Sequence, residues 1–179
     1  MDWCIHSEVV DRALMDSKTI STKKYKNYSL VFTFDAKKES KQLLKIKKKH
    51  LYTYFKKYWE WNSLKMLQEL TLNEMRYVLV YKTGSEDIVG YASYTFIHEH
   101  EPNTNVLYLF ELHTCTSHRG QGLGNLIMEH LELIAKLYKL QEIRLTCFCD
   151  NKAYQWYLSK SFHINYECSK HVHELKKKI

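Results

Sequence analysis

Residues 117–125 read SHRGQGLGN and hold three of the five glycines of the chain. They lie between a stretch of strand-forming residues, 105–115, and the most regular helical pattern of the sequence, 123–138. Glycines before a helix let backbone N–H groups approach an anion closely, and the N-terminus of the helix adds positive potential. The segment therefore predicts an anion-binding loop that joins a strand to a helix in an α/β protein.

Two common phosphate-binding loops are excluded by the residues that follow the glycines. A P-loop requires Gly-Lys-Ser/Thr, whereas Gly124 is followed by Asn125 and Leu126. A dinucleotide-binding loop requires the spacing GxGxxG, whereas this segment has GxGxG. The pattern that remains is Arg119-x-x-Gly122-x-Gly124. A helix start softened by glycine, without any ligand, is the alternative interpretation.

Helical and strand periodicities alternate on both sides of this loop. Apolar residues spaced three or four apart predict helices at 5–16, 41–58, 63–70, 123–138 and 152–160. Runs of β-branched and aromatic residues predict strands at 28–35, 76–82, 88–98, 105–115, 142–149 and 162–168. This order predicts an α/β (α+β) fold in which helices flank one mixed sheet.

The composition is that of an ordinary globular chain. Its 179 residues are 45% hydrophobic and 26% charged, which excludes a disordered chain and fits a single domain over 1–179. No apolar run approaches the roughly 18 residues of a membrane span, and residues 1–16 do not resemble a secretory signal, so we expect no membrane attachment. The five cysteines contain no CxxC pair, which favours reduced thiols, an intracellular location and no metal site.

Charge is segregated along the chain. Of the net charge of +7, residues 18–57 contribute thirteen lysines against two acidic residues, or +11, which leaves −4 for the rest. Residues 83–118 contain five acidic residues and neither lysine nor arginine. The lysine-rich 18–57 region is either a solvated helix face or a surface that contacts DNA or nucleosomes. The acidic stretch is either a mostly buried sheet or a site for a cationic ligand.

The loop pattern resembles the pyrophosphate loop of the GNAT acetyltransferases. Tyr157 to Phe162 also resembles the Tyr-x-x-x-Gly-Phe segment of that superfamily, with Ser161 in place of glycine. The resemblance implies a GNAT core over 28–168, preceded by a helical extension, 1–27, and followed by a basic tail, 169–179. It also implies that acetyl-CoA is the cosubstrate and is held by Leu112, His113, Thr114, Arg119, Gly120, Gln121, Gly122, Leu123, Gly124, Asn125 and Asn151.

A narrower resemblance is to the NatD group, the N-alpha-acetyltransferases that act on histone tails beginning Ser-Gly-Arg-Gly. It rests on the segments YFKKYWEW at 54–61, VLYLFE at 106–111 and LTCF at 145–148. Phe110 departs from it, because that group has tyrosine there. The resemblance implies histone N-terminal peptides as partners, a monomer, a location in the nucleus and cytoplasm, and a peptide site lined by Tyr54, Glu99, Tyr108, Phe110 and Thr146.

The chemistry of acetyl transfer to an amine points to further residues. The reaction needs a base for the amine, a donor for the developing oxyanion and a proton for the leaving thiolate. Glu111 interrupts an apolar strand eight residues before the glycine loop and is the expected base, with His113 as the alternative. Tyr157 or Tyr154 is expected to protonate the thiolate. Two other functions stay open: acetylation of a polyamine or lysine side chain, and a catalytically silent nucleosome-binding module.

Overall fold

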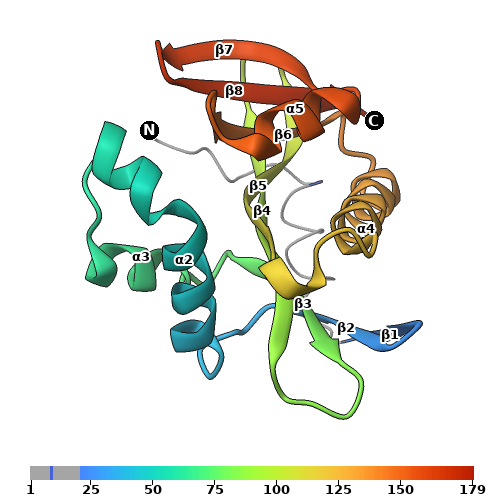
Figure 1. The fold of residues 1–179 in the computed structure, drawn as a ribbon. Helices are drawn as coiled ribbons and strands as arrows, with labels where there is room; N and C mark the ends of the chain where they lie inside the picture. The colour runs from blue at the N-terminus through green and yellow to red at the C-terminus, as the bar shows by residue number, and fades with distance from the viewer. Residues whose placement is uncertain (1–8, 10–20) are drawn as a thin grey trace.

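The computed structural model describes residue 9 and residues 21–179. These residues form an eight-stranded sheet of order β1-β2-β3-β4-β5-β6-β8-β7 (Figure 1). The strands are β1 (Ser21–Tyr25), β2 (Tyr28–Thr33), β3 (Arg76–Lys82), β4 (Ile88–Glu99), β5 (Thr104–Thr114), β6 (Glu142–Phe148), β7 (His163–Ser169) and β8 (Val172–Lys178). The helices are α2 (Ser40–Tyr58), α3 (Ser63–Glu69), α4 (Leu123–Leu137) and α5 (Lys152–Ser159), with a 3-10 turn, η1 (Thr116–His118). The predicted α/β class with a mixed sheet is confirmed, whereas the predicted helix at 5–16 lies outside the described residues.

Neighbouring strands are antiparallel except for β5 and β6, which are parallel. Parallel strands need a crossover connection, and α4 provides it after the glycine-rich segment. The N-terminus of α4 therefore lies near the end of β5, where the sequence predicts the anion site. This connection places the loop in the middle of the sheet.

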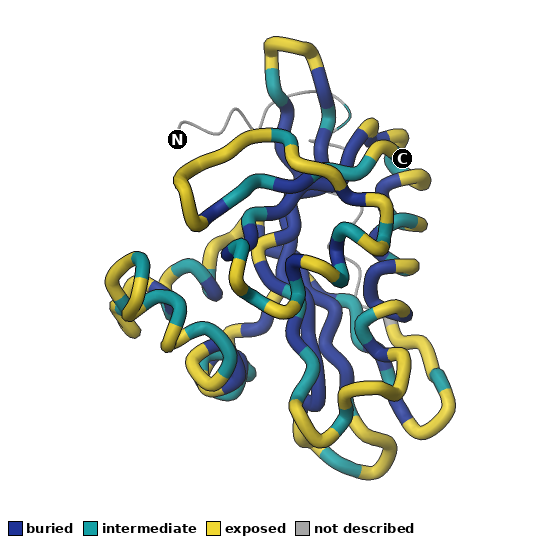
Figure 2. Tube along the Cα trace, turned by 45° about the horizontal axis from the view of Figure 1, so that its top comes forward, coloured by how far each residue is buried: buried dark blue, intermediate teal, exposed yellow. Residues whose placement is uncertain are grey.

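Helices cover both faces of the sheet (Figure 1). On one face, Leu43 and Ile46 of α2 pack with Tyr77 and Tyr91 of β3 and β4. On the other face, the apolar sides of α4 and α5 pack against β3 to β6 in a larger core. Buried residues run along the central strands, and exposed residues concentrate on the outer helices and loops (Figure 2). No helix within the described part of the chain is long and apolar enough to cross a bilayer.

Two strands occur where the sequence analysis predicts none. Residues 21–25, assigned to a helical extension, form edge strand β1, whose lysines are common on sheet edges. Residues 172–178, assigned to a basic tail, form β8 between β6 and β7. The periodicity of β8 is masked by its lysines, yet Leu175 is fully buried. Lys177 instead reaches Glu132 of α4 at 2.7 Å, so a positive residue on this strand is paired with a carboxylate.

Candidate active site

A gap between β5 and β6 forms the floor of the site. The parallel register of these strands ends at Leu109 and Leu145. On its other side, β5 shifts register against β4: Leu109 faces Tyr94, whereas Glu111 faces Ser93. Such a bulge inserts one residue and bends the strand. The bend turns the end of β5 away from β6 and leaves space between them for a ligand.

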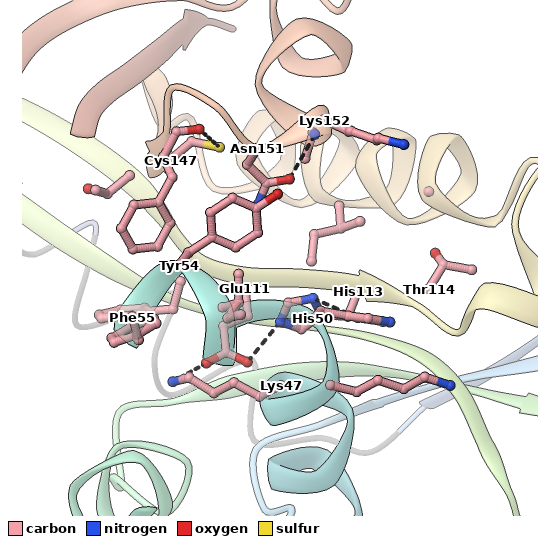
Figure 3. Close-up of a pocket in the computed structure, with 18 of the residues that line it drawn as sticks. Lys47, His50, Tyr54, Phe55, Glu111, His113, Thr114, Cys147, Asn151 and Lys152 are labelled. Carbon is pink, nitrogen blue, oxygen red and sulfur yellow. Dashed lines mark hydrogen bonds and ion pairs between the residues drawn. The ribbon is translucent and has the colours of Figure 1, made fainter. Parts of the chain in front are cut away.

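A cleft of about 1310 Å³ occupies this space. Its walls come from α2, α3, the end of β5, the glycine loop, β6 and α5 (Figure 3). Small-molecule sites in proteins usually measure about 300–1,000 Å³. The cleft is therefore large enough for two reactants that meet over the end of β5.

The glycine loop supplies the anion-binding end of the cleft. Gly122 precedes α4 with a φ of 84°, a left-handed conformation that favours glycine. A Cβ on Gly124 would lie 3.5 Å from the ring of Trp156, which is an ordinary packing contact, so Gly122 is the one of these two positions whose backbone favours glycine. Gly122 to Asn125 line the cleft, and the first N–H groups of a helix lack acceptors within the helix. The loop thus fits a phosphate or pyrophosphate group.

Glu111 is buried at the base of the cleft, with 5% of its side chain exposed. Its carboxylate forms an ion pair with Lys47 of α2 and accepts a hydrogen bond from the hydroxyl of Tyr91. Burial raises the pKa of Glu111, but the neighbouring His113 and the Lys47 ammonium outweigh burial and lower the pKa to about 2. Glu111 is consequently an ionised and weakly basic carboxylate at neutral pH.

Two histidines lie next to this carboxylate (Figure 3). His113 Nε2 is 3.5 Å from a carboxylate oxygen of Glu111. His113 Nδ1 is 3.4 Å from His50 Nδ1, which α2 brings to the same wall. Burial, with the positive charge of neighbouring groups, lowers the pKa of His50 to about 4. His50 is therefore neutral at physiological pH.

Helix α5 places a phenol on the other side of the cleft. Tyr157 lines the cleft, and burial raises its pKa, so it stays protonated and can donate a proton. Asn151 begins α5: its side-chain oxygen accepts a hydrogen bond of 3.0 Å from the Ala153 N–H. This cap fixes where α5 starts. It therefore also fixes the position of Tyr157, which lies in the same helix six residues after Asn151.

An aromatic cluster forms the third wall of the cleft. Phe148 of β6 stacks on Tyr54 with 5.4 Å between ring centroids and lies 4.9 Å from Trp59. Trp59 is 49% exposed and Phe110 is 39% exposed, which is unusual for side chains of this size. In this part of the cleft, the exposed aromatic rings can pack against a bound ligand.

Comparison of the sequence with models of protein families identifies the family to which this fold and cleft belong. The model of the acetyltransferase (GNAT) family matches residues 41–162, from α2 through the glycine loop to the end of α5. The chain belongs to the GNAT acetyltransferase family. It is thus an acetyl-CoA-dependent acetyltransferase, and the anion-binding loop fits the pyrophosphate of that cosubstrate. When bound, acetyl-CoA supplies the thioester-linked acetyl group.

Solved structures share the GNAT fold at low sequence identity. An acetyltransferase from Streptococcus agalactiae superposes with a TM-score of 0.65 at 14% identity, over 87% of this chain and 100% of that one. PaiA N-acetyltransferase from Thermoplasma acidophilum, in complex with coenzyme A, gives 0.62 at 13% identity, over 84% and 99%. Arabidopsis thaliana NAA60, in complex with a bisubstrate analogue, gives 0.59 at 11% identity, over 84% and 99%.

Most of the site residues that the sequence analysis selects meet in this GNAT cleft. The lining includes Tyr54, Phe110, Glu111, Leu112, His113, Thr114, Arg119, Gly120, Gly122, Leu123, Gly124, Asn125, Thr146, Asn151 and Tyr157. They come from α2, β5, the loop, α4, β6 and α5, which are far apart in the sequence. Gln121 does not line the cleft: its side chain accepts a hydrogen bond from Tyr28.

Glu99 does not lie where the resemblance to NatD places it. It ends β4, whereas the cleft lies at the far end of β5, and it is not among the lining residues. Its carboxylate accepts a hydrogen bond of 2.7 Å from Arg144, which also binds Glu142 at 2.7 Å. Because Arg144 is buried, these carboxylates neutralise its charge. Glu99 thus already binds a cation of the protein, although 35% of its side chain is exposed.

Two of the selected tyrosines also point elsewhere. The Tyr154 hydroxyl lies 2.8 Å from His173 Nδ1 on β8, outside the cleft, so Tyr157 is the phenol available to a thiolate. Tyr108 is buried below the floor, with its hydroxyl 2.6 Å from that of Thr146. The ring of Tyr108 nevertheless contacts that of Phe110, with 5.1 Å between the centroids, so Tyr108 packs against a lining residue without lining the cleft itself.

Among the lining residues that the sequence analysis did not select, three contact selected ones: Lys47 contacts Glu111, His50 contacts His113, and Phe148 contacts Tyr54. Lys47 and His50 were assigned to a solvated lysine-rich face of α2, and Phe148 was given no role. The position of Lys47 and His50 on the buried face of α2 could have been recognised from their spacing. Together with Leu43 and Ile46 they recur every three or four residues, as residues on one face of a helix do. A lysine on that face requires a buried carboxylate, which Glu111 provides.

The described cysteines form no disulfide, and one of them lies in the cleft wall. Cys115, Cys147, Cys149 and Cys168 are all free, although Cys147 lines the cleft. Among the described residues, no three histidine, cysteine or acidic side chains come together as a metal-binding group.

Proposed function

We propose that the chain acetylates the N-terminal α-amine of a peptide, and that a histone tail beginning Ser-Gly-Arg-Gly is its substrate. One observation carries the proposal: Tyr54, Trp59, Phe110 and Thr146, which belong to the segments resembling NatD, line one part of the cleft. That part adjoins the end of β5, where the acyl group must be transferred. An extended peptide end can enter there while the cosubstrate occupies the loop side.

The catalytic chemistry is compatible with an α-amine. Such an amine has an ordinary pKa near 8, so a useful fraction is already deprotonated at neutral pH. The cleft needs only to remove one proton during attack and to return one to the thiolate, and the neutral phenol of Tyr157, which lines the cleft, supports the second step. A lysine side chain, with an ordinary pKa near 10.4, is almost wholly protonated at neutral pH and would have to lose a proton before it could attack.

Acetyl transfer to a matched set of amines tests the proposal. The set contains a peptide beginning Ser-Gly-Arg-Gly, the same peptide with a blocked N-terminus and an internal lysine, and spermidine. We expect the acetyl group on the α-amine of the free peptide, located by mass spectrometry of fragments. Acetylation of the blocked peptide or of spermidine alone would contradict the proposal and favour the other cationic amines as substrates.

The histone substrate also suggests where the enzyme works. We propose that it acts in the nucleus and cytoplasm as a monomer and that the lysine-rich face of α2 contacts nucleosomal DNA. Exposed Lys41, Lys45, Lys48 and Lys56 support this surface, because none lies at the buried face of the helix. Binding to nucleosomes should then weaken steeply as salt rises, whereas binding to the free peptide should change much less.

A further inference from the structure

The buried carboxylate is a poor candidate for the proton acceptor. Glu111 already accepts the Tyr91 hydroxyl and faces the Lys47 ammonium, so its oxygens are occupied by groups of the protein. A proton acceptor also needs a lone pair that is free to face the substrate, and the carboxylate of Glu111 has His113 Nε2 within 3.5 Å as well. A different group must take up the amine proton, and the histidines beside Glu111 are the groups in reach.

The distances restrict where the protons lie on these rings. A neutral imidazole has one N–H and one lone pair. His113 Nε2 lies 3.5 Å from the negative carboxylate of Glu111 without forming a hydrogen bond to it, so it is the electrostatic attraction of the carboxylate that favours a proton on Nε2 and a lone pair on Nδ1. His50 faces that lone pair with its own Nδ1 at 3.4 Å, so His50 must carry its proton on Nδ1. The lone pair of His50 therefore lies on Nε2.

That nitrogen has no use within the described protein. His50 Nε2 is buried and has no hydrogen-bond partner in the described part of the chain, as is true of three other side-chain atoms (His113 Nε2, Ser93 Oγ and His118 Nδ1), and His50 lines the cleft. Buried polar atoms are nearly always bonded, and an exception calls for a catalytic or ligand-binding explanation. No structural role for this atom is evident, because the ring contact with His113 does not require a nitrogen at that position.

We infer that His50 is the proton acceptor of the acetyltransferase, and that His113 and Glu111 are positioning residues that set its tautomer and stabilise its protonated form. In the transfer, the amine nitrogen forms a bond to the acetyl carbon and the C–S bond breaks. One proton passes from the nitrogen to His50 Nε2, directly or through one water, and the thiolate takes one proton from Tyr157 or solvent. The charge on His50 is then shared along the line from His50 through His113 to Glu111.

The surroundings keep the acceptor neutral before attack. The charged and titratable groups that face the two rings from the packed elements are Lys47, Lys49, Tyr91, Glu111 and Arg119. Three of these are positive, and only Glu111 is negative at neutral pH. His50 therefore stays unprotonated until the attacking nitrogen becomes positive and strongly acidic, at which point a weak base is sufficient.

The first experiment needs no substrate. In protein labelled with nitrogen-15 in its histidines, long-range proton–nitrogen NMR spectra at pH 7.5 distinguish the two tautomers, and His50→Asn identifies the His50 signals by their loss. We expect His50 protonated on Nδ1 and His113 on Nε2. A proton on His50 Nε2 would overturn the inference, whether or not any tested amine is acetylated.

The second experiment uses whichever amine the wild-type enzyme acetylates. His50→Asn retains a donor near the position of Nδ1 but removes the acceptor, and His50→Ala leaves a space for imidazole. Both should lower kcat about a hundredfold or more without changing the affinity for acetyl-CoA, and added imidazole should restore part of the activity of His50→Ala. The matched control is His163→Ala, an exposed position on β7, which should keep wild-type activity and ignore imidazole.

The outcomes separate the two proposals. Activity of His50→Ala within threefold of wild type would overturn the role of His50, even if the histone peptide proves to be the substrate. A loss of activity in His50→Ala that imidazole does not relieve, together with full activity of His50→Asn, would also overturn it. If the wild-type enzyme acetylates no peptide, the proposed substrate is contradicted. The NMR measurement of the tautomers then decides the role of His50.

Discussion

Replacing Glu111 by Gln should cost the fold a measurable part of its stability. The side chain keeps its shape, but the buried one of the two carboxylates that pair with Lys47 loses its charge, which leaves only the more exposed Glu69 at 3.3 Å. The pKa of Glu111 is lowered from 4.5 to about 2, and at about 1.4 kcal/mol for each tenfold change this corresponds to about 3 kcal/mol of folding free energy. Breaking a buried ion pair by removing one partner typically costs a similar 3–5 kcal/mol.

Urea unfolding at pH 7 measures this difference directly. For a chain of this length, about 3 kcal/mol should also lower the melting temperature by about 9 °C. Because the pKa of Glu111 is depressed in the folded state, its contribution is complete above pH 4.5 and is lost as the pH falls toward 2. The gap between wild type and Glu111→Gln should therefore shrink to about half by pH 3.

A double variant distinguishes the ion pair from packing. Lys47→Met removes the stranded ammonium, so Lys47→Met combined with Glu111→Gln should be less destabilised than the sum of the two single variants. Equal stability of wild type and Glu111→Gln within about 0.5 kcal/mol at pH 7 would refute the reasoning. A gap that is unchanged between pH 7 and pH 3 would refute it as well, because a purely steric effect does not titrate.

Three further changes test other parts of the site. Gly122→Glu places a negative side chain where the phosphates should bind, in a conformation that only glycine readily adopts, so calorimetry should show acetyl-CoA affinity at least about tenfold weaker. Tyr157→Phe should lower kcat by about tenfold or more, as measured at saturating cosubstrate, with unchanged acetyl-CoA affinity, because it removes the phenol proton but keeps the ring. Because Glu99 binds Arg144 within the protein, the effects on kcat/KM of Glu99→Gln in the enzyme and of Arg→Ala in the peptide should add. A double-mutant cycle in which the two effects are strongly non-additive would show that Glu99 contacts the arginine of the peptide.

The fold could be predicted largely because its strongest signals are local. The glycine loop and the regular periodicity of α4 identify the crossover, and the alternation of helices and strands around it gives the mixed sheet. Strands β1 and β8 were missed for a local reason too, since their lysines hide the pattern of a strand. Partners from elsewhere in the fold, such as Glu132 for Lys177, make such a strand stable.

The site was predictable only in part because its chemistry depends on contacts between distant segments. Glu111 could be chosen from its place in an apolar strand, but its low basicity follows from His113 and from Lys47, which lies 64 positions earlier. Likewise, a carboxylate such as Glu99 looks available in the sequence, and only the fold shows that Arg144 binds it. Residue spacing thus indicates which side-chain types the site contains. The groups that bind those side chains in the folded protein determine which of them can react.

The insertion of β8 between β6 and β7 has a consequence for synthesis of the chain. The ribosome produces β6, α5 and β7 before β8, so β6 has an open edge and β7 has no neighbouring strand of the described sheet until residues 172–178 emerge. Strand β6 carries Thr146 and Phe148, which line the cleft. An open edge of this kind can pair with another chain, so the nascent protein passes through a stage prone to aggregation. The cleft wall that carries Thr146 and Phe148 is therefore complete only after residues 172–178 have paired with β6.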